Sequence, residues 1–356
     1  MKVPLSSLVR ENIRKMEKYA SARDDFSGPA RIFLDANENA FGSPSDHTLN
    51  RYPDPLQKQL RKRIADYKQL EDPETVFLGN GSDEAIDLLM RAFCVPGTDK
   101  LMIMSPTYGM YSVCAHINDV RILDVPLKKD FSLDTEGVIE TAQKEKPKLI
   151  FICSPNNPSG NVYAPGDIEK ILNATDSLVM IDEAYIDFSE ARSWIGRINE
   201  FPNLVVIQTF SKAWGMAGVR LGMAFSNKEL VSVLNKIKYP YNINDVTARI
   251  VLETLRSPGR KEEMVRKIKE ERRYLMETMI GIPLVKEVFP SEANFFLARF
   301  EDPDRVYRYL SGEGIIVRNR SGQLHCEGCL RITVGTHEEN TLLCEALNHY
   351  REREDA

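Results

Sequence analysis

Short apolar runs that alternate with helical segments between residues 75 and 209 constrain the fold of this chain more than any other feature. Each run is rich in β-branched and aromatic residues and is short enough for one buried strand. This alternation predicts an α/β domain with a mostly parallel central sheet, because parallel strands need helical crossovers. We expect strands at 76–78, 100–104, 148–153, 177–181 and 204–208.

Polar residues gather where these predicted strands end. Polar clusters follow the strands at 79–84, 105–108, 154–160, 182–185 and 211–212. In an open α/β sheet, ligands bind at the carboxyl ends of the strands. The sequence therefore predicts a binding site at one edge of the sheet.

Lys212 stands where a buried strand runs into a glycine-containing loop that leads to Arg220. Desolvation lowers the pKa of a lysine, and a neutral lysine amine is a nucleophile that can form a Schiff base with a carbonyl. Ser211 and Arg220 offer a hydroxyl and a guanidinium that suit a phosphate. Together these residues indicate pyridoxal 5'-phosphate, a carbonyl cofactor with a phosphate. On this stretch alone, an exposed loop lysine is the alternative.

Two other strand ends agree with this cofactor. Ser82 and Asp83 open a helix, so their backbone N–H groups can hold the phosphate, although the same residues also suit a simple helix cap. Asp182 ends a buried strand, where a carboxylate needs a cationic partner. A protonated pyridine nitrogen would supply that charge and make the ring an electron sink.

Three further polar residues can contact the ring of such a cofactor. Tyr185 and the amide of Asn157 can hydrogen-bond its phenolic oxygen, and Tyr108 can stack on its face. Singly, each also fits a core tyrosine or a turn asparagine. Because such polar clusters follow one strand after another along the chain, we prefer the cofactor-binding interpretation to the structural one.

The overall composition excludes several other classes of protein. A net charge of −5 without a dense lysine or arginine block argues against a nucleic-acid partner. No segment approaches the roughly 18 apolar residues of a membrane span, and the charged N-terminus lacks the apolar centre of a signal peptide. We therefore expect a cytoplasmic protein with small-molecule substrates.

The 356 residues suggest two domains, and the pattern changes after about residue 240. We expect a large cofactor-binding domain over 28–242 and a small α+β domain that combines 1–27 with 243–356. The small domain would contain a charged helix at 260–279, three strands at 293–300, 314–317 and 330–334, and a final helix.

The segment before residue 75 contains one strong helical signal. Apolar residues recur at helical spacing over 56–67, and its basic residues, Arg61 among them, predict a solvated face. We also expect a short strand at 31–34 and a rigid turn at 51–55, where two prolines fix the backbone.

Cys326 and Cys329 have a spacing that is typical of metal sites. A zinc site needs further ligands, and only His325 stands nearby. We favour a pair of reduced thiols and keep a metal site as the alternative.

Several motifs resemble those of known enzymes. SPNNPSG, DEAY and SKAWGMAGVRLG are similar to motifs of the fold-type I pyridoxal-phosphate aminotransferases. A further set more closely resembles the histidinol-phosphate aminotransferase family: DANENAFGSP, RYPDP, GNGSDEAIDLL, PTYGMY, IIVRNR and CLRITVGT. The resemblance runs from about residue 30 to residue 340. It implies a homodimeric enzyme of histidine biosynthesis that interconverts L-histidinol phosphate and 2-oxoglutarate with imidazole-acetol phosphate and L-glutamate.

The resemblance also implies roles for individual residues. Lys212 would bond to the cofactor and then carry a proton between substrate and cofactor. Arg331 would bind the α-carboxylate of the amino acid, and Arg318 would face the phosphate of the other substrate. Tyr52 would reach the cofactor phosphate of the second chain, so that the dimer shares its active sites. For the cofactor ring, the implied contacts are Asp182 with the pyridine nitrogen, Tyr185 and Asn157 with the phenolic oxygen, and Tyr108 with the ring face. The cofactor phosphate would contact Ser82, Asp83, Ser211 and Arg220. The substrate would also contact Tyr19, Asn37 and Tyr52.

Alternatives within the same fold are a threonine-phosphate decarboxylase and an aromatic amino-acid aminotransferase, which differ only around the substrate. A non-catalytic regulator that binds the cofactor is an alternative of another class. Such a regulator normally carries a DNA-binding segment, and we expect none ahead of the predicted catalytic domain.

Overall fold

The computed structural model describes residues 4–19, 31–45 and 47–354, and a seven-stranded sheet forms its centre. Its strands are β1 (Val76–Asn80), β2 (Lys100–Ile103), β3 (Arg121–Asp124), β4 (Leu149–Cys153), β5 (Leu178–Asp182), β6 (Leu204–Thr209) and β7 (Leu221–Phe225). They are ordered β1-β7-β6-β5-β4-β2-β3. Only β7 runs against its neighbours in this sheet. The predicted mostly parallel α/β sheet is confirmed.

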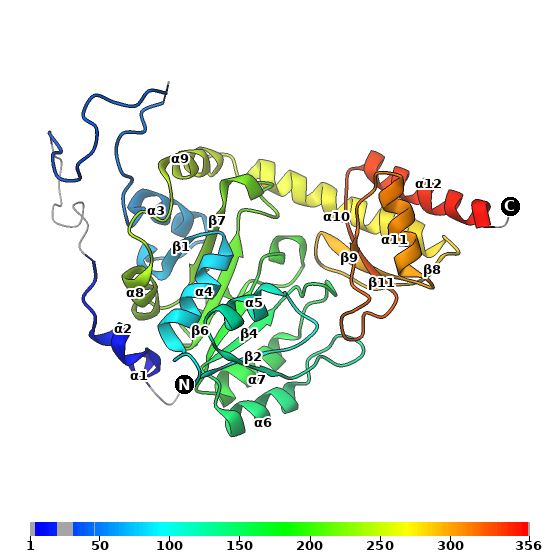
Figure 1. Ribbon diagram of the computed structural model, residues 1–356, viewed down its shortest axis with the longest axis horizontal. Coiled ribbons are helices and arrows are strands. Elements are labelled where there is room, and N and C mark those ends of the chain that lie inside the picture. Colours follow the sequence, from blue (N-terminus) through cyan, green and yellow to red (C-terminus); the bar gives the residue numbers. More distant parts are fainter. Residues whose placement is uncertain (1–3, 20–30, 46, 355–356) are drawn as a thin grey trace.

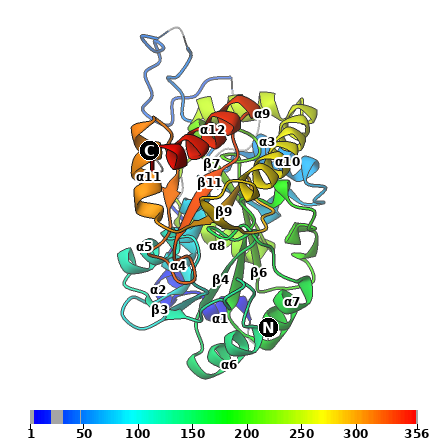
Figure 2. The same cartoon turned by 90° about the vertical axis from the view of Figure 1, so that its right-hand side faces the viewer.

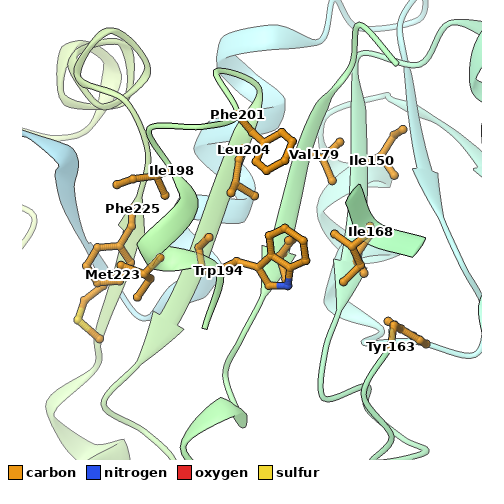
Figure 3. Packing of buried hydrophobic residues seen from close by; sticks show 14 of the residues in the cluster. Ile150, Tyr163, Ile168, Val179, Trp194, Ile198, Phe201, Leu204, Met223 and Phe225 are labelled. Carbon is orange, nitrogen blue, oxygen red and sulfur yellow. The ribbon is translucent and has the colours of Figure 1, made fainter. Parts of the chain in front are cut away.

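Helices cover both faces of this sheet and bury two apolar cores. One core contains residues of α3 (Lys58–Tyr67), α6 (Thr135–Glu145), α7 (Pro165–Ala174) and α9 (Asp245–Thr254). The other contains residues of α4 (Ser82–Phe93), α5 (Met110–Ile117) and α8 (Lys228–Ile237). Side chains of a strand alternate between the faces, so Ile150 enters the first core and Phe151 the second. Figure 3 shows Trp194 and Phe201 in the first core.

A smaller antiparallel sheet follows in the chain. It is ordered β10-β11-β9-β8, from β8 (Val285–Val288), β9 (Phe295–Phe300), β10 (Arg318–Asn319) and β11 (Cys329–Thr333). Figure 1 shows α10 (Gly259–Ile280) running from the neighbourhood of α9 to this sheet. Figure 2 shows α11 (Pro303–Gly312) and α12 (His337–Glu354) beside β9 and β11. Our domain boundaries remain a prediction, and the one at residues 27–28 lies outside the described residues.

The described part of the N-terminal segment lies with the larger sheet, not with the smaller one as we expected. It forms α1 (Leu5–Leu8) and α2 (Glu11–Lys15), and the side chains of Leu5 and Leu8 enter the core of α4 and α8. The Arg10 N–H donates a hydrogen bond to the Ala92 carbonyl at 2.9 Å. Burial of these leucines against the larger domain is the physical reason for the correction.

Other local expectations also need correction. Residues 31–34 form no strand, and the side chains of Ile32 and Leu34 are largely exposed. The strand expected at 314–317 begins at Arg318, where pairing with β11 begins. Arg61 is buried rather than solvated, and its Nε donates to the Pro73 carbonyl. Sequence analysis also missed β3, β7 and β8.

Within the described ranges, no helix is both long and apolar enough to cross a membrane.

Gly222 brings β7 against the turn that begins α4. A Cβ atom at this position would lie 2.1 Å from the Ser82 nitrogen. We therefore expect Gly222→Ala to lower the free energy of unfolding by about 1–3 kcal/mol, as overpacking does. The measurement is thermal or denaturant unfolding. Gly166→Ala in α7 is the control, because a Cβ there meets no atom within 4 Å. Equal stability of the Gly222→Ala variant and the wild type would contradict the close packing.

Candidate active site

A cavity of about 150 Å³ lies at the carboxyl ends of β4, β5 and β6. The strand ends contribute Cys153, Asp182 and Thr209 to its wall. Nine residues singled out from the sequence line the cavity: Ser82, Asp83, Tyr108, Asn157, Asp182, Tyr185, Ser211, Lys212 and Arg220. The strand-end clusters, far apart in sequence, thus meet at one place.

One end of the cavity contains groups that suit a phosphate. Helix α4 begins there after Gly81, which supplies no capping side chain for the N–H groups of the first turn. The Arg220 guanidinium lies so close that a Cβ at Gly81 would be 2.7 Å from its Nη2. The hydroxyl of Ser211 also lines this cavity. Helix amides, a guanidinium and a hydroxyl fit the phosphate of pyridoxal 5'-phosphate.

Asp182 provides a buried carboxylate at the centre of the cavity floor. Its Oδ2 accepts a hydrogen bond from the Tyr111 hydroxyl at 2.8 Å, and its Oδ1 accepts one from the Ala184 N–H at 3.0 Å. Burial nevertheless raises the pKa of Asp182 to about 6. A cation in the cavity would stabilise the ionised form of this buried carboxylate, so the site fits a protonated pyridine nitrogen.

Lys212 enters the cavity from the loop that follows β6. Lys212 is exposed, yet the surrounding protein partly desolvates its amine and thereby lowers the pKa of Lys212. The positive charge of Arg331 lowers it further, and Asp182 acts in the opposite direction. A larger share of the amine is therefore neutral than in an ordinary lysine, and this is the form that can act as a nucleophile or a base.

A hydrogen-bonded chain links the cavity to the smaller sheet. The Asn157 Nδ2 donates to the Tyr185 hydroxyl at 3.5 Å, and the Arg331 Nη1 of β11 donates to the Asn157 Oδ1 at 2.5 Å. The Tyr185 ring packs edge-on against Phe295 of β9, with ring centres 4.9 Å apart. Asn157 and Tyr185, the residues predicted to contact the phenolic oxygen of the cofactor, are thereby held next to Arg331, the residue predicted to bind the substrate carboxylate.

Tyr108 forms a side wall of the cavity. Its hydroxyl donates to the Asp83 Oδ1 at 3.2 Å, and its ring stands at 90° to that of Tyr111, with centres 5.5 Å apart. Both contacts hold the ring in one orientation, which suits the stacking role predicted for Tyr108.

None of the five predicted substrate residues lines this cavity itself. Arg331 contacts Asn157 in the cavity wall, and the other four lie elsewhere. Arg318 is exposed on β10, opposite Arg331. Tyr52 is half exposed and stacks on Tyr241, with ring centres 4.4 Å apart, and Asn37 lines the same surface hollow. Tyr19 is largely exposed at another hollow. The structure brings none of these four to Lys212 within one chain, so their roles remain predictions.

Sequence analysis missed Tyr111, which is fully buried and donates to Asp182. A signal existed, because Tyr111 stands in the same PTYGMY motif as Tyr108, although Tyr108 precedes α5 and Tyr111 lies within it. Its partner Asp182 is 71 residues away in the chain, so only the parallel packing of the sheet reveals the contact.

Cys326 and Cys329 are both buried and free of disulfides. Burial raises the pKa of Cys326 to about 12 and that of Cys329 to about 11, so both thiols stay protonated. Across the described ranges, no three metal-ligating side chains are grouped to hold a metal ion. Both side chains belong to the first apolar core, and Cys329 is part of β11, the strand that carries Arg331.

The pKa of Asp182 gives a measurable pH dependence. Its shift from 3.8 to about 6 means that the folded protein binds the proton more tightly than the unfolded chain. The stability from Asp182 is therefore fully present below pH 3.8 and is lost as pH rises through about 6. Asp182→Asn escapes this loss, and without cofactor it should exceed the wild type in stability by on the order of 3 kcal/mol above pH 7.

The measurement is thermal unfolding of cofactor-free protein between pH 4 and 8. Asp66→Asn on the exposed face of α3 is the control and should show no such pH-dependent gain. A stability difference between Asp182→Asn and the wild type that stays the same at every pH would contradict the raised pKa.

Comparisons with known proteins agree with this geometry. The family model for aminotransferase class I and II matches residues 29–347. A histidinol-phosphate aminotransferase of Cytophaga hutchinsonii is 50% identical over 350 residues, which cover 98% of this chain and 100% of the relative.

Solved structures share the fold. The histidinol-phosphate aminotransferase from Clostridium acetobutylicum has a TM-score of 0.79 at 27% identity and covers 86% of this chain and 92% of its own. That from Sinorhizobium meliloti, solved in complex with pyridoxal-5'-phosphate, has a TM-score of 0.77 at 23% identity, with 88% and 89% covered. These matches confirm the resemblance seen in the motifs. The chain belongs to the class I and II aminotransferases and, within them, to the histidinol-phosphate aminotransferase family.

Proposed function

We propose that this enzyme interconverts L-histidinol phosphate and 2-oxoglutarate with imidazole-acetol phosphate and L-glutamate, using pyridoxal 5'-phosphate. The observation that carries the proposal is the position of Lys212, with its lowered pKa, in one cavity with Asp182 and the phosphate cradle at α4. The identity with histidinol-phosphate aminotransferases along nearly the whole chain supports the choice of substrate.

The cofactor, when bound, supplies a carbonyl that accepts the amino group and a ring that withdraws electrons from the reacting carbon. The protein contributes the charges and the proton carrier. The Asp182 carboxylate stabilises a positive ring nitrogen, and Arg220 with the first turn of α4 anchors the phosphate. The Lys212 amine takes a proton at the substrate α-carbon and returns it on the cofactor side, which predicts two half-reactions in turn.

The substrate end of the site is cationic. Arg331 offers a guanidinium for bidentate binding of a carboxylate, and Arg318 stands opposite it for a second anion. This arrangement supports a reaction in which both partners are anionic amino compounds. Threonine-phosphate decarboxylase and aromatic aminotransferase activities remain the alternatives, because all three reactions use the same cofactor residues.

We also propose that the enzyme is a homodimer with shared active sites. Residues 31–45 and 47–50 extend away from the rest of the chain (Figure 1). Leu34 is 87% exposed and Phe41 is fully exposed, although both are large and apolar. This N-terminal arm would bury its exposed apolar side chains if a second copy of the chain packed against it. Tyr52 lies at the end of the arm. All six cysteines are free, which fits the reducing cytoplasm that we expect.

A spectral half-reaction tests the proposed function. Purified enzyme loaded with cofactor is mixed separately with histidinol phosphate, threonine phosphate and phenylalanine, and the absorbance of the cofactor is followed. We expect histidinol phosphate to convert the cofactor to its amine form with the highest kcat/KM. Lys212→Ala should abolish this conversion while the cofactor still binds through its phosphate. Faster reaction with phenylalanine, or decarboxylation of threonine phosphate, would instead favour one of the alternatives.

Mixed dimers test the shared site. Lys212→Ala and Tyr52→Ala chains should each be defective as pure dimers. A mixed dimer keeps one site with an intact Lys212 and an intact Tyr52 from the other chain, so co-refolding should restore part of the wild-type activity. Activity no higher than the sum of the two variants, although mixed dimers have formed, would mean that Tyr52 acts within its own chain or not at all.

A further inference from the structure

Three arginine side chains share one face of the smaller sheet beside the cavity. Arg318 of β10 lies directly opposite Arg331 of β11 in the antiparallel register. The ladder continues for one residue, since the Arg320 N–H donates to the Cys329 carbonyl at 2.9 Å. Side chains alternate along a strand, so Arg318 and Arg320 face one side and Asn319 faces the other. There Asn319 donates to Asp304 of α11 at 2.6 Å.

The arginine face is the one turned toward the active site. The Arg331 guanidinium donates to Asn157, which lines the cavity. After burial, the charges of Arg331 and Arg318 are the largest contributions that lower the pKa of Arg320. The three guanidinium groups therefore lie within range of one another and next to the substrate end of the cavity.

Nothing in the described part of the chain neutralises this charge. None of the three arginines forms an ion pair with a carboxylate of the described residues, and like charges directly opposite each other destabilise a sheet. Several buried polar atoms here also lack partners. Of nine buried side-chain atoms that lack a hydrogen bond among the described residues, four lie on this strand pair and in the turn between its strands: Arg320 Nε, Ser321 Oγ, Gln323 Oε1 and Arg331 Nε.

We infer that Arg320 is a specificity-determining residue that, together with Arg318, binds the phosphate of the amino substrate as a dianion. The inference rests on the proposed function and extends it to a residue for which neither the motifs nor the strand ends predicted a role. A bound phosphate would neutralise the positive charge of this face and accept hydrogen bonds from the arginine N–H groups that lack partners.

The chemistry of the two amino donors explains why a third guanidinium is needed. Glutamate carries a carboxylate directly on the carbon that bears the amine. Histidinol phosphate carries a CH₂–O–phosphate group on the equivalent carbon, so its anion reaches further and has a charge of about −1.5 to −2 at pH 7. Arg331 alone suits the carboxylate. The larger and more highly charged phosphate reaches Arg318 and Arg320, which extend the same cationic face along β10.

Substitution of Arg320 in the cofactor-loaded enzyme tests the inference. In separate half-reactions, Arg320→Gln should raise the half-saturating concentration of histidinol phosphate about tenfold and that of glutamate by less than about twofold, since one charge-assisted hydrogen-bond partner of the phosphate is lost. Competitive inhibition by inorganic phosphate should weaken in parallel. Arg320→Lys keeps the charge without the forked donors and should lose less.

A pH profile separates recognition of the dianion from a merely structural role. The second ionisation of a phosphate ester lies near pH 6, so binding of histidinol phosphate to the wild type should strengthen as pH rises through about 6. In Arg320→Gln this gain should become smaller. Arg308→Gln on the exposed side of α11 makes the same charge change and should leave both substrates unaffected.

Two outcomes would overturn the inference. One is unchanged binding of histidinol phosphate and inorganic phosphate to Arg320→Gln. The other is an equal rise in the half-saturating concentrations of glutamate and histidinol phosphate in both Arg320 variants. That result would mean that Arg320 has a structural role in the sheet and no role in phosphate recognition. A wild type that does not react with histidinol phosphate would instead refute the proposed function, and the inorganic-phosphate measurement would still decide whether Arg320 binds a phosphate.

Discussion

The buried carboxylate of Asp182 is the constraint on which the rest of the site depends. A charged group at the end of a strand in the middle of a sheet is stable only when donors and a cation surround it. Tyr111 and the Ala184 N–H supply the donors, and burial still raises the pKa to about 6. Burial of the Asp182 carboxylate therefore costs the protein free energy, and a positively charged ring next to the carboxylate lowers this cost. The site consequently favours a cofactor with a protonated ring nitrogen.

The two sheets act together because the contacts between them are both polar and apolar. Arg331 reaches across to Asn157, and Tyr185 and Phe295 pack in one small core with Val265 of the long helix α10. A shift of the smaller sheet would therefore displace the proposed substrate residue Arg331 and the proposed cofactor residue Asn157 at the same time. This coupling gives a physical reason for the catalytic groups to lie between two packed units rather than on one surface.

Charge is divided between the two ends of the site. The end beside α4 holds one guanidinium, from Arg220, and the positive end of a helix. The end beside β10 and β11 carries Arg318, Arg320 and Arg331 without a neutralising carboxylate in the described chain. Lys212 lies between them, and its ammonium form is disfavoured by burial and by Arg331. An anionic ligand is thus attracted to both ends while the central amine tends toward its neutral form.

Local patterns along the chain were enough to predict the class of fold and the position of the cavity. Strand–helix alternation favours a parallel sheet, and parallel strands bring their carboxyl ends to one edge, so Asp182 and Lys212 were expected at the same cavity. Other features depend on tertiary packing that local patterns do not encode. The contact from Tyr111 to Asp182 and the packing of α1 on α4 join residues far apart in the chain, and the burial of Arg61 depends on its contact with the Pro73 carbonyl. The cationic face that includes Arg320 depends on the register between β10 and β11, and register follows from side-chain packing across strands rather than from either strand alone.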